Sequence, residues 1–502
     1  PRPSPVTWSE TEPSPESSTE PPLPERTRRD LPQRISTLPA STRPRDVGSS
    51  VTLPTRSRLR LSQPLPTSTR GSFDSGRASL IDGERSLSVD VFIATYDEEP
   101  ELVRESVRAA CQLTYPVALE LNVYVLDDGR RESLRRVAEE EGVGYVSRRD
   151  NVGYKAGNLR HAMQWTWGDF IVICDADTHL FPAFLEETLG YFRDPRVAWV
   201  QTPQWFPDIP EGERLSEWLG RHVGRFGAAL GARVERWLGP LRIGEDPLGN
   251  DAQFFFDVVQ RRRNRAMASF CCGAASVHRR SAVMAAALRR YSEEVERELG
   301  RRLQAARRRG EPLARTAGYR AQLRDELLAS TEPMPYQFHV SEDLYTSLVL
   351  HSDTAGAWRS VLHPKVLSWM LSPQDATSWV IQRFKYAGGT LDLGVRDFPL
   401  TRPGLPWPHR WMYTATLWSH ASALWSLVLL LAPALYLVTG ISPVRSYGGW
   451  FPLLVVPFLL SGTAARALLS WGIPGRSGRG AQLALIPVTL RALVTVLLRR
   501  PI

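Results

Sequence analysis

The sequence predicts an α/β domain, in which a parallel sheet carries helices on both faces, followed by membrane-spanning and interfacial helices. Short apolar runs alternate with helical stretches between residues 89 and 177, and long apolar runs are concentrated in the last hundred residues. Such alternation produces a parallel sheet, because each helix returns the chain along one face of the sheet. Long apolar runs bordered by Trp and Arg are typical of membrane helices rather than of buried soluble helices.

Four short apolar runs predict the strands of the sheet. Ligands bind at the carboxyl ends of parallel strands, and acidic residues follow the second and fourth runs directly. We therefore expect Asp127, Asp128, Asp175 and Asp177 to lie at one edge of the sheet. The predicted strands are Val89–Ala94, Leu119–Leu126, Gly144–Val146 and Phe170–Cys174, with helices over 102–110 and 131–141.

The charge balance favours an anionic partner. The 502 residues carry 62 Lys and Arg against 53 Asp and Glu, which gives a net charge of +9 and a pI of about 9.6. This balance suits phosphorylated substrates or an anionic membrane surface. Nucleic acid is not expected as a partner, because the arginines do not form one stripe interleaved with aromatic residues. The four cysteines show no CxxC spacing, which argues against a zinc site and favours reduced thiols.

Composition divides the chain into three parts. Residues 1–86 are rich in Pro, Ser, Thr and Arg without apolar periodicity, which predicts a disordered tail, with a regulatory or partner-binding arm as the alternative. Residues 87–405 form the predicted α/β domain. Its basic insertion at about 285–335 consists either of solvated helices or of a surface for an anionic polymer or lipid. Residues 406–502 form the predicted membrane part.

Four segments of the last part are candidates for contact with the membrane. Trp407–Leu424 is rich in Trp, Tyr and His, which predicts an interfacial helix. Ala423–Val438 with its flanks is long enough to span a bilayer, and Trp450–Leu468 is the second predicted span. Leu483–Leu498, which is flanked by arginines, is expected either to span the bilayer or to lie in its interface.

Asp175 and Asp177 predict a site for Mg²⁺ or Mn²⁺. Two carboxylates on one turn can hold a divalent cation against a diphosphate, because hard cations prefer oxygen ligands. The cation would neutralise a diphosphate leaving group as its bond to a sugar breaks. Two aspartates at a strand end are common in any protein, so this prediction depends on the motifs that accompany them.

Three further motifs supply groups for such a reaction. Of Asp127 and Asp128, one could accept a hydrogen bond from a nucleobase or ribose, and the other could support the metal. Lys155 opens a helix in the run YKAGN and can reach a phosphate or a base. Ser341 could simply cap the helix that follows it. The functional alternative makes Asp343 of the same run, SED, the general base that takes the proton from an acceptor hydroxyl.

The run QRFKY at 382–386 combines an amide, two cations and an aromatic ring just before the membrane part. Arg383 and Lys385 suit a diphosphate leaving group. Tyr386 suits stacking against the face of a sugar. The alternative interpretation is an ordinary basic amphipathic helix beside the membrane.

This succession of motifs resembles the processive family 2 glycosyltransferases and, within them, the bacterial cellulose synthase catalytic subunit. The resemblance covers about residues 88–502, and several motifs in family order are far more specific than any single one. The motifs are TYDEEP at 95–100, LDDG at 126–129, YKAGN at 154–158, DAD at 175–177, QTPQWF at 201–206, FCCG at 270–273, SED at 341–343 and QRFKY at 382–386.

The resemblance implies a GT-A fold on the cytoplasmic side of the bacterial inner membrane. UDP-glucose would be the donor and a growing β-glucan the acceptor, with inversion at the anomeric carbon and a channel of transmembrane helices for the product. It also raises two regulatory expectations, which are an accessory periplasmic subunit and control by cyclic-di-GMP through a domain that would follow Ile502.

The resemblance also implies roles for individual residues. Asp343 would be the base, and Asp175 and Asp177 would hold UDP and Mg²⁺ or Mn²⁺. The nucleotide site would contain Thr95, Tyr96, Glu98, Asp128 and Lys155. The diphosphate would face Gln382, Arg383 and Lys385, and the acceptor sugar would rest on Tyr386. The acceptor path would include Gln201-Thr202-Pro203 and Cys272-Gly273.

Two departures from the family pattern leave alternatives open. The sequence has SED where the family usually has TED, and Lys385 and Tyr386 where it has the Arg and Trp of QxxRW. Lysine keeps the charge but lacks the bidentate fork of arginine. The polymer could therefore be a mixed-linkage glucan, a mannan or a chitin-like chain, and transfer of a single sugar to a lipid is a further alternative. The remaining alternative is that the protein is a non-catalytic nucleotide-sugar sensor or a scaffold.

Overall fold

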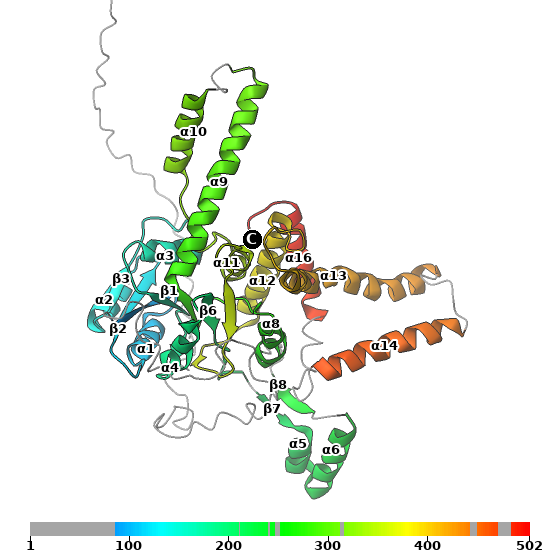
Figure 1. Cartoon of the computed structure of the whole chain (residues 1–502). Coiled ribbons are helices and arrows are strands. Elements are labelled where there is room, and N and C mark those ends of the chain that lie inside the picture. Colours follow the sequence, from blue (N-terminus) through cyan, green and yellow to red (C-terminus); the bar gives the residue numbers. More distant parts are fainter. Residues whose placement is uncertain are drawn as a thin grey trace, which may run out of the picture. The chain divides into compact units, whose positions relative to one another are not determined.

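The computed structural model describes residues 86–209, 211–238, 241–245, 252–311, 316–441, 449–469 and 483–502, so that the predicted tail lies outside the described residues up to position 85. A seven-stranded sheet forms the centre of the described part, with the strand order β10-β6-β9-β4-β1-β2-β3 (Figure 1). The strands are β1 Leu87–Thr95, β2 Leu119–Asp127, β3 Gly144–Val146, β4 Phe170–Asp175, β6 Val197–Gln201, β9 Ser276–Arg279 and β10 Arg359–Leu362.

The sheet is mixed, whereas the sequence predicted a parallel one. The four predicted strands are confirmed as β1 to β4, and β1 pairs in parallel with β2 and β4, as β2 does with β3. β9 runs antiparallel between β4 and β6. This strand has only four residues, and its buried Ser276 and His278 interrupt any apolar run. Apolar patterning could therefore not detect it.

Apolar side chains alternate between the two faces of the sheet, which explains the continuous apolar runs of its central strands. In β4, Phe170, Val172 and Cys174 join the core on one face, whereas Ile171 and Ile173 join the core on the other. A strand covered on both faces must be apolar at every position. Helices α1 (Pro100–Cys111) and α2 (Glu132–Glu140) cover the first face, and α3 (Tyr154–Met163) covers the second.

The remaining elements complete the domain and connect it to the apolar part. They are β5 His179–Leu180, α4 Phe184–Thr188, the 3₁₀ helix Leu189–Arg193, β7 Glu211–Arg214, α5 Leu215–Val223, α6 Arg225–Leu238, β8 Arg242–Glu245, α7 Ala252–Phe254, the π-helix Phe255–Gln260, α8 Arg261–Asn264, α9 Arg280–Arg308, α10 Ala317–Ser330, α11 Glu342–Ser352, β11 Ser368–Trp369, α12 Ala376–Arg396, α13 Trp407–Thr439, α14 Trp450–Leu469 and α16 Ile486–Leu497.

The predicted basic insertion is a helical hairpin of α9 and α10 (Figure 1). The first turns of α9 belong to the domain, since Ala282 and Val283 pack into its core. The rest of α9 pairs with α10 through a small apolar core of its own, which contains Val295, Leu299, Leu303, Leu323 and Leu327. The sequence did not predict the second hairpin, α5 with α6.

Of the predicted membrane segments, only α13 is both long and apolar enough to cross a membrane among the residues that the structure describes. Its 33 residues exceed the roughly 20 that a bilayer requires. The predicted interfacial and spanning segments are thus one continuous helix rather than two. α14 covers the second predicted span, and the third candidate is the 12-residue α16, whose buried Ile486, Ala492 and Val496 show that one face is packed.

Candidate functional site

The sheet brings the predicted strand ends together at one edge. Thr95, the last residue of β1, lies opposite Asp127 of β2, and Ala94 lies opposite Asp175 of β4. Because all three strands run in parallel, the loops that follow them leave the sheet side by side. The loops that carry Tyr96, Asp128 and Asp177 therefore surround one site.

Asp127 stabilises this edge rather than facing a ligand. Its carboxylate is fully buried and accepts hydrogen bonds from the backbone N–H groups of Gly129 (2.9 Å) and Arg131 (2.6 Å). The Arg131 guanidinium also donates to Asp127 (3.1 Å) and to the Thr95 hydroxyl (2.8 Å). Asp127 thus holds the turn that follows β2, and sequence reasoning missed the role of Arg131.

The loop after β1 is closed by Glu98. Its carboxylate accepts hydrogen bonds from the Thr95 hydroxyl (2.6 Å) and from the backbone N–H of Tyr96 (2.8 Å). The Tyr96 side chain, by contrast, is 57% exposed. Of these three predicted nucleotide-site residues, Tyr96 therefore presents the most free surface, while Thr95 and Glu98 fix the loop that carries it.

Asp128 forms a buried bidentate ion pair with Arg148. Arg148 donates from Nε to Oδ1 (2.6 Å) and from Nη2 to Oδ2 (2.7 Å), which is the planar fork that guanidinium and carboxylate groups favour. Arg148 also donates to the carbonyl oxygens of Val152 (2.5 Å) and Tyr154 (2.8 Å). The pair therefore attaches the loop before α3, and with it Lys155, to the end of β2. Apart from the place of Arg148 shortly after the third strand, nothing in the sequence indicates this role.

Lys155 lies between Asp175, at the end of β4, and the turn that contains Gly273. Its ammonium forms an ion pair with Asp175 and donates to the carbonyl oxygen of Gly273 (3.3 Å). Burial opposes its charge, but the charges of Asp175, Glu342 and Asp343 outweigh this effect and raise the pKa of Lys155. Lys155 is therefore a fixed cation at the centre of the acidic cluster.

Asp175 and Asp177 suit a divalent cation. Burial and the charge of Asp175 raise the pKa of Asp177 to about 7, and a cation between the two carboxylates would remove that penalty. Asp177 accepts a hydrogen bond from the Leu371 N–H (3.2 Å), which fixes its orientation. Among the described residues no third acidic, His or Cys side chain completes a metal cluster. The other ligands would therefore be diphosphate oxygens and water.

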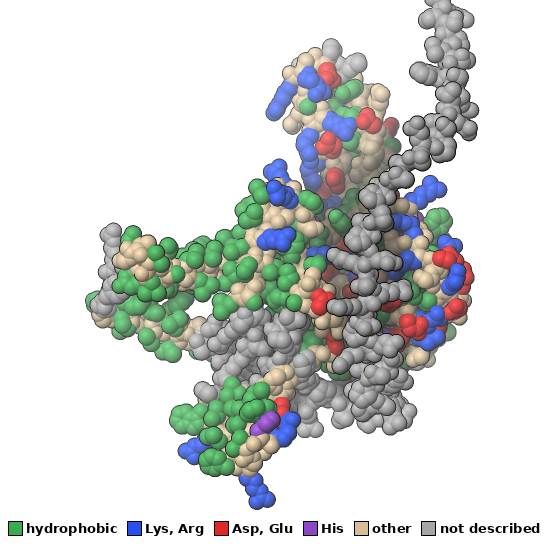
Figure 2. Space-filling view, turned by 180° about the vertical axis from the view of Figure 1, so that it is seen from behind, with side chains coloured by type: hydrophobic (Ala, Val, Ile, Leu, Met, Phe, Trp, Pro, Cys, Tyr) green, Lys and Arg blue, Asp and Glu red, His purple; other side chains and the backbone are tan. Residues whose placement is uncertain are grey.

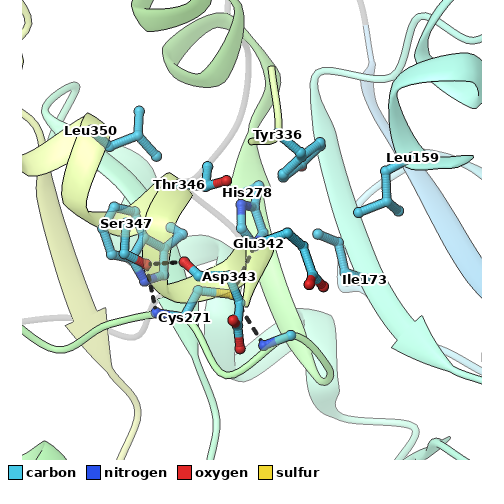
Figure 3. A pocket seen from close by; sticks show the side chains of 12 residues that line it. Leu159, Ile173, Cys271, His278, Tyr336, Glu342, Asp343, Thr346, Ser347 and Leu350 are labelled. Carbon is cyan, nitrogen blue, oxygen red and sulfur yellow. Dashed lines mark hydrogen bonds between the residues drawn. The ribbon is translucent and has the colours of Figure 1, made fainter. Parts of the chain in front are cut away.

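The two carboxyl groups of the SED run point in different directions. Figure 3 shows the Glu342 carboxyl directed toward Ile173, and the Asp343 carboxyl directed away from it. Both residues line a small cavity of about 10 Å³. Burial raises the pKa of both groups above the usual range, and the charge of Asp343 adds to the effect at Glu342. Ser341 precedes the helix but makes no side-chain capping bond, so capping does not account for the run.

The FCCG turn contacts both Asp343 and Lys155 through Gly273. Gly273 has φ +85, and a Cβ built on it would lie 3.5 Å from the Asp343 Oδ2 and 3.6 Å from the Lys155 Nζ. The two side chains therefore converge on one small space, and the backbone conformation there favours glycine. The turn is attached to α11, because the Ser347 hydroxyl accepts from the Cys271 N–H (2.9 Å) and donates to the Asp343 carbonyl (2.8 Å).

Gln201 is a support of this turn. Its side chain is fully buried, accepts a hydrogen bond from the Cys272 N–H (2.7 Å) and donates to the carbonyl oxygens of Thr202 and Ala274 (2.9 Å each). Thr202 is also fully buried and donates to the Ala275 carbonyl (2.9 Å). These residues, which the family resemblance assigned to an acceptor path, hold the FCCG turn in place.

The QRFKY run lies on α12, one turn before the point where this helix packs on the SED run. A Cβ built on Gly389 would lie 2.1 Å from the Ser341 hydroxyl, so the helices are in close contact. Residues three, four and seven positions earlier share that face of a helix, which places Gln382, Lys385 and Tyr386 toward α11. The Tyr386 side chain is 50% exposed, so its ring is accessible at this site. Arg383 lies 6.0 Å from the centre of the Tyr386 ring.

The fold and this site agree with a known class of protein. Residues 90–285 match the family model "Glycosyl transferase family 2". Together with the central α/β sheet, this match identifies a family 2 glycosyltransferase domain of GT-A fold. The fold class expected from the motifs is thus confirmed.

The particular relatives are cellulose synthases. The chain is 30% identical to cellulose synthase 2 of Novacetimonas hansenii over 353 residues, which are 70% of this chain and 17% of that protein. It is 28% identical to the UDP-forming cellulose synthase catalytic subunit of Pseudomonas fluorescens (strain SBW25) over 393 residues, which are 78% of this chain and 42% of that protein. The resemblance drawn from the motifs is confirmed, although the chain spans less than half the length of these relatives.

Among solved structures, the mannosyltransferase PcManGT from Pyrobaculum calidifontis, in complex with GDP-Man and Mn²⁺, is similar to the chain with a TM-score of 0.47 and 17% identity. The likeness covers 84% of this chain and 90% of that one.

Proposed function

We propose that the protein is a metal-dependent, inverting and processive glycosyltransferase that transfers glucose from UDP-glucose to a growing β-glucan. The observation that carries the proposal is the convergence of Asp343 and Lys155 on the Gly273 turn, beside Asp175. A pure nucleotide-sugar sensor would need the cation and the acidic pair, but it would have no use for a further carboxylate that can act as a base.

In the proposed reaction Asp343 is the general base. Its carboxylate takes the proton from the acceptor hydroxyl while the hydroxyl oxygen attacks the anomeric carbon of the donor. The bond from that carbon to the diphosphate oxygen breaks on the opposite side, so the configuration inverts and UDP leaves with the bonding electrons. The raised pKa of Asp343 suits this role, because a more basic carboxylate accepts a proton more readily.

The remaining site residues bind and orient the reactants in this proposal. A divalent cation held by Asp175 and Asp177, Mg²⁺ or Mn²⁺, would neutralise the charge that develops on the diphosphate. Tyr96 and the loop fixed by Thr95, Glu98 and Asp128 would bind the nucleotide, and Lys155 would face the phosphates. The diphosphate would contact Gln382, Arg383 and Lys385, and the acceptor sugar would rest on Tyr386.

The proposed location is the bacterial inner membrane, with α13 crossing the bilayer and the catalytic domain on the cytoplasmic side. The exposed apolar surface of α13 supports this location. Export of the glucan through the membrane, an accessory periplasmic subunit and control by cyclic-di-GMP stay predictions from the family resemblance.

Donor-specific turnover tests the proposal. The protein in lipid nanodiscs is supplied with UDP-glucose and Mg²⁺ or Mn²⁺, and UDP release and product length are measured. We expect UDP release that depends on the metal, and a polymer that an endo-β-1,4-glucanase degrades. Turnover with GDP-mannose or UDP-N-acetylglucosamine instead would identify a different polymer, and a product with a single added sugar would contradict processivity. Metal-dependent UDP binding without turnover of any donor would support the sensor.

The matched control is an aspartate far from the site. Asp325→Asn converts an exposed carboxylate on α10 to an amide, which is the same chemical change as in Asp343→Asn. We expect it to keep full turnover, so that loss in the Asp343 variant reports the position of the carboxylate rather than its charge alone.

A further inference from the structure

The α5–α6 hairpin leaves an apolar surface that nothing in the described structure covers. Gly224 joins the two helices with φ +77, a conformation that favours glycine. On α6, Phe226 is 78% exposed, Leu230 is 49% exposed and Trp237 is 86% exposed. Residues four and eleven positions apart share one face of a helix, so these three side chains form one stripe.

This stripe does not face the partner helix within the hairpin. α6 packs on α5 through its glycines, since a Cβ on Gly227 would lie 2.4 Å from the Leu219 carbonyl oxygen and one on Gly231 would lie 2.5 Å from the Ser216 Cα. Gly227 and Gly231 lie on a different side of the helix from Phe226. The close packing of the hairpin therefore fixes the stripe in an outward position.

Arginines border the stripe on one side. At helical spacing Arg225, Arg233 and Arg236 fall beside the apolar residues, all three are exposed, and none forms an ion pair with another described residue. The acidic residue of α6, Glu235, lies on the packing side and accepts a hydrogen bond from the Ser216 hydroxyl (2.9 Å). Figure 2 shows hydrophobic side chains over this hairpin with basic side chains at its margin.

We propose that the α5–α6 hairpin binds the surface of an anionic lipid bilayer through Phe226, Leu230 and Trp237, with Arg225, Arg233 and Arg236 contacting the headgroups. An aromatic and apolar face bordered by arginine is the composition of helices that lie in the interface plane. Arginine can also extend its charged end to the headgroups while its stem stays on the apolar side. A second copy of the chain fits less well, because the arginines of two such faces would repel each other.

The same chain offers a membrane contact elsewhere. α13 is long and apolar enough to cross a bilayer and lies largely exposed. The hairpin would add a second, charge-dependent contact, since each arginine near an anionic surface strengthens binding about fivefold. The hairpin contains none of the residues of the proposed glycosyltransferase site, so the proposal does not depend on that function.

Spin-label accessibility in proteoliposomes tests this proposal. In a Cys111→Ser background, which removes the exposed thiol, Leu230→Cys and Ala232→Cys are each labelled with a nitroxide. The protein is reconstituted in phosphatidylcholine alone or in phosphatidylcholine mixed with the anionic lipid phosphatidylglycerol. Collision rates with oxygen and with a nickel chelate report apolar and aqueous surroundings. Ala232 is exposed but lies away from the stripe, so it is the matched control.

We expect the label at 230 to be accessible to oxygen and shielded from nickel in the anionic vesicles, and the label at 232 to show the reverse. Replacing Arg225, Arg233 and Arg236 together by Gln should return the label at 230 to water. Nickel access at 230 in anionic vesicles would overturn the proposal, and so would equal shielding in both lipids. Spin–spin broadening that disappears on dilution with unlabelled protein would identify a second copy as the occupant and would also overturn it.

Discussion

The carboxyl edge of the sheet and the α5–α6 hairpin differ in the kind of side chain that they bury and expose. At the sheet edge, charged groups are buried: Asp127 and the Asp128–Arg148 pair are almost inaccessible to water. On the hairpin, large apolar groups are exposed, with Trp237 86% accessible. Buried charge and exposed apolar surface both cost free energy in an isolated protein. At the sheet edge, ion pairs and hydrogen bonds offset this cost, whereas no described residue covers the apolar surface of the hairpin.

The α9–α10 hairpin shows that exposure of apolar side chains is not a general property of the helical insertions. There Leu299 and Leu327 are buried between the helices, and Arg302 pairs with Glu298 and Glu326 on the outside. That hairpin covers its own apolar face. The difference in packing, leucines in one hairpin and glycines in the other, decides which of them presents an apolar surface.

The largest expected effect concerns the buried carboxyl group of Asp343. Asp343→Asn keeps the shape of the side chain but removes the base, so we expect kcat to fall by about 10²–10⁴-fold. The affinity for UDP, measured by calorimetry with Mn²⁺, should change little. Turnover within tenfold of the parent would assign the base to another residue.

The next largest effect concerns the Asp128–Arg148 pair. Arg148→Leu leaves Asp128 buried without its partner, and breaking such a pair costs about 3–5 kcal/mol. Urea unfolding followed by tryptophan fluorescence should show this loss in the free energy of unfolding. Arg149→Leu, at the exposed neighbouring position, is the control and should be close to neutral. Equal stability of both variants would mean that Arg148 is not a structural support.

The pH dependence of turnover should reflect the raised pKa of Asp343. Burial raises it to about 6, and only the ionised form can act as the base. The rate should therefore rise with pH, by about tenfold between pH 5 and pH 7 for a single group of this pKa. The measurement is the initial rate of UDP release at saturating donor and metal. A rate that falls over this interval would contradict the assignment.

A smaller effect is expected from the neighbouring Glu342. Burial raises the pKa of Glu342 to about 8 in the folded protein, above its ordinary value. The neutral side chain therefore favours the folded state fully below the ordinary pKa, and this contribution to the free energy of unfolding is lost as the pH rises through 8. Glu342→Gln stays neutral at every pH. The variant should be more stable than the parent at pH 9, where the parent must ionise a buried carboxyl group, and little changed at pH 5. Thermal unfolding without ligand measures this, with the exposed Glu139→Gln as control.

The smallest effect is expected on the hairpin. Trp237→Ser removes a side chain that contacts water over most of its surface, so the free energy of unfolding in detergent should change by less than about 0.5 kcal/mol. Leu299→Ala in the α9–α10 core should cost about 2–5 kcal/mol in the same measurement. A large loss from Trp237→Ser would show that the exposed stripe stabilises the chain itself.

Much of the fold could be predicted because it depends on local pattern. β1 to β4 are apolar at successive positions, and the carboxylates follow them directly, so both the strands and the position of the acidic turns were accessible from the sequence. β9 could not be predicted, since its antiparallel place depends on where the chain returns through the FCCG turn. The α5–α6 hairpin was not predicted, although Phe226, Leu230 and Trp237 of α6 recur at helical spacing.

The sequence alone determined which chemical groups the protein carries and their order along the chain, because strand patterning and motif identity are local properties. Only the tertiary structure decided which groups are free. Asp127 and Asp128 are adjacent and look equivalent in the sequence, yet one holds its own turn and the other holds the loop before Lys155. Glu342 and Asp343 are also adjacent, but one carboxyl points toward Ile173 and the other converges with Lys155 on Gly273. Burial and pairing arise from segments distant in sequence, so no local pattern specifies them.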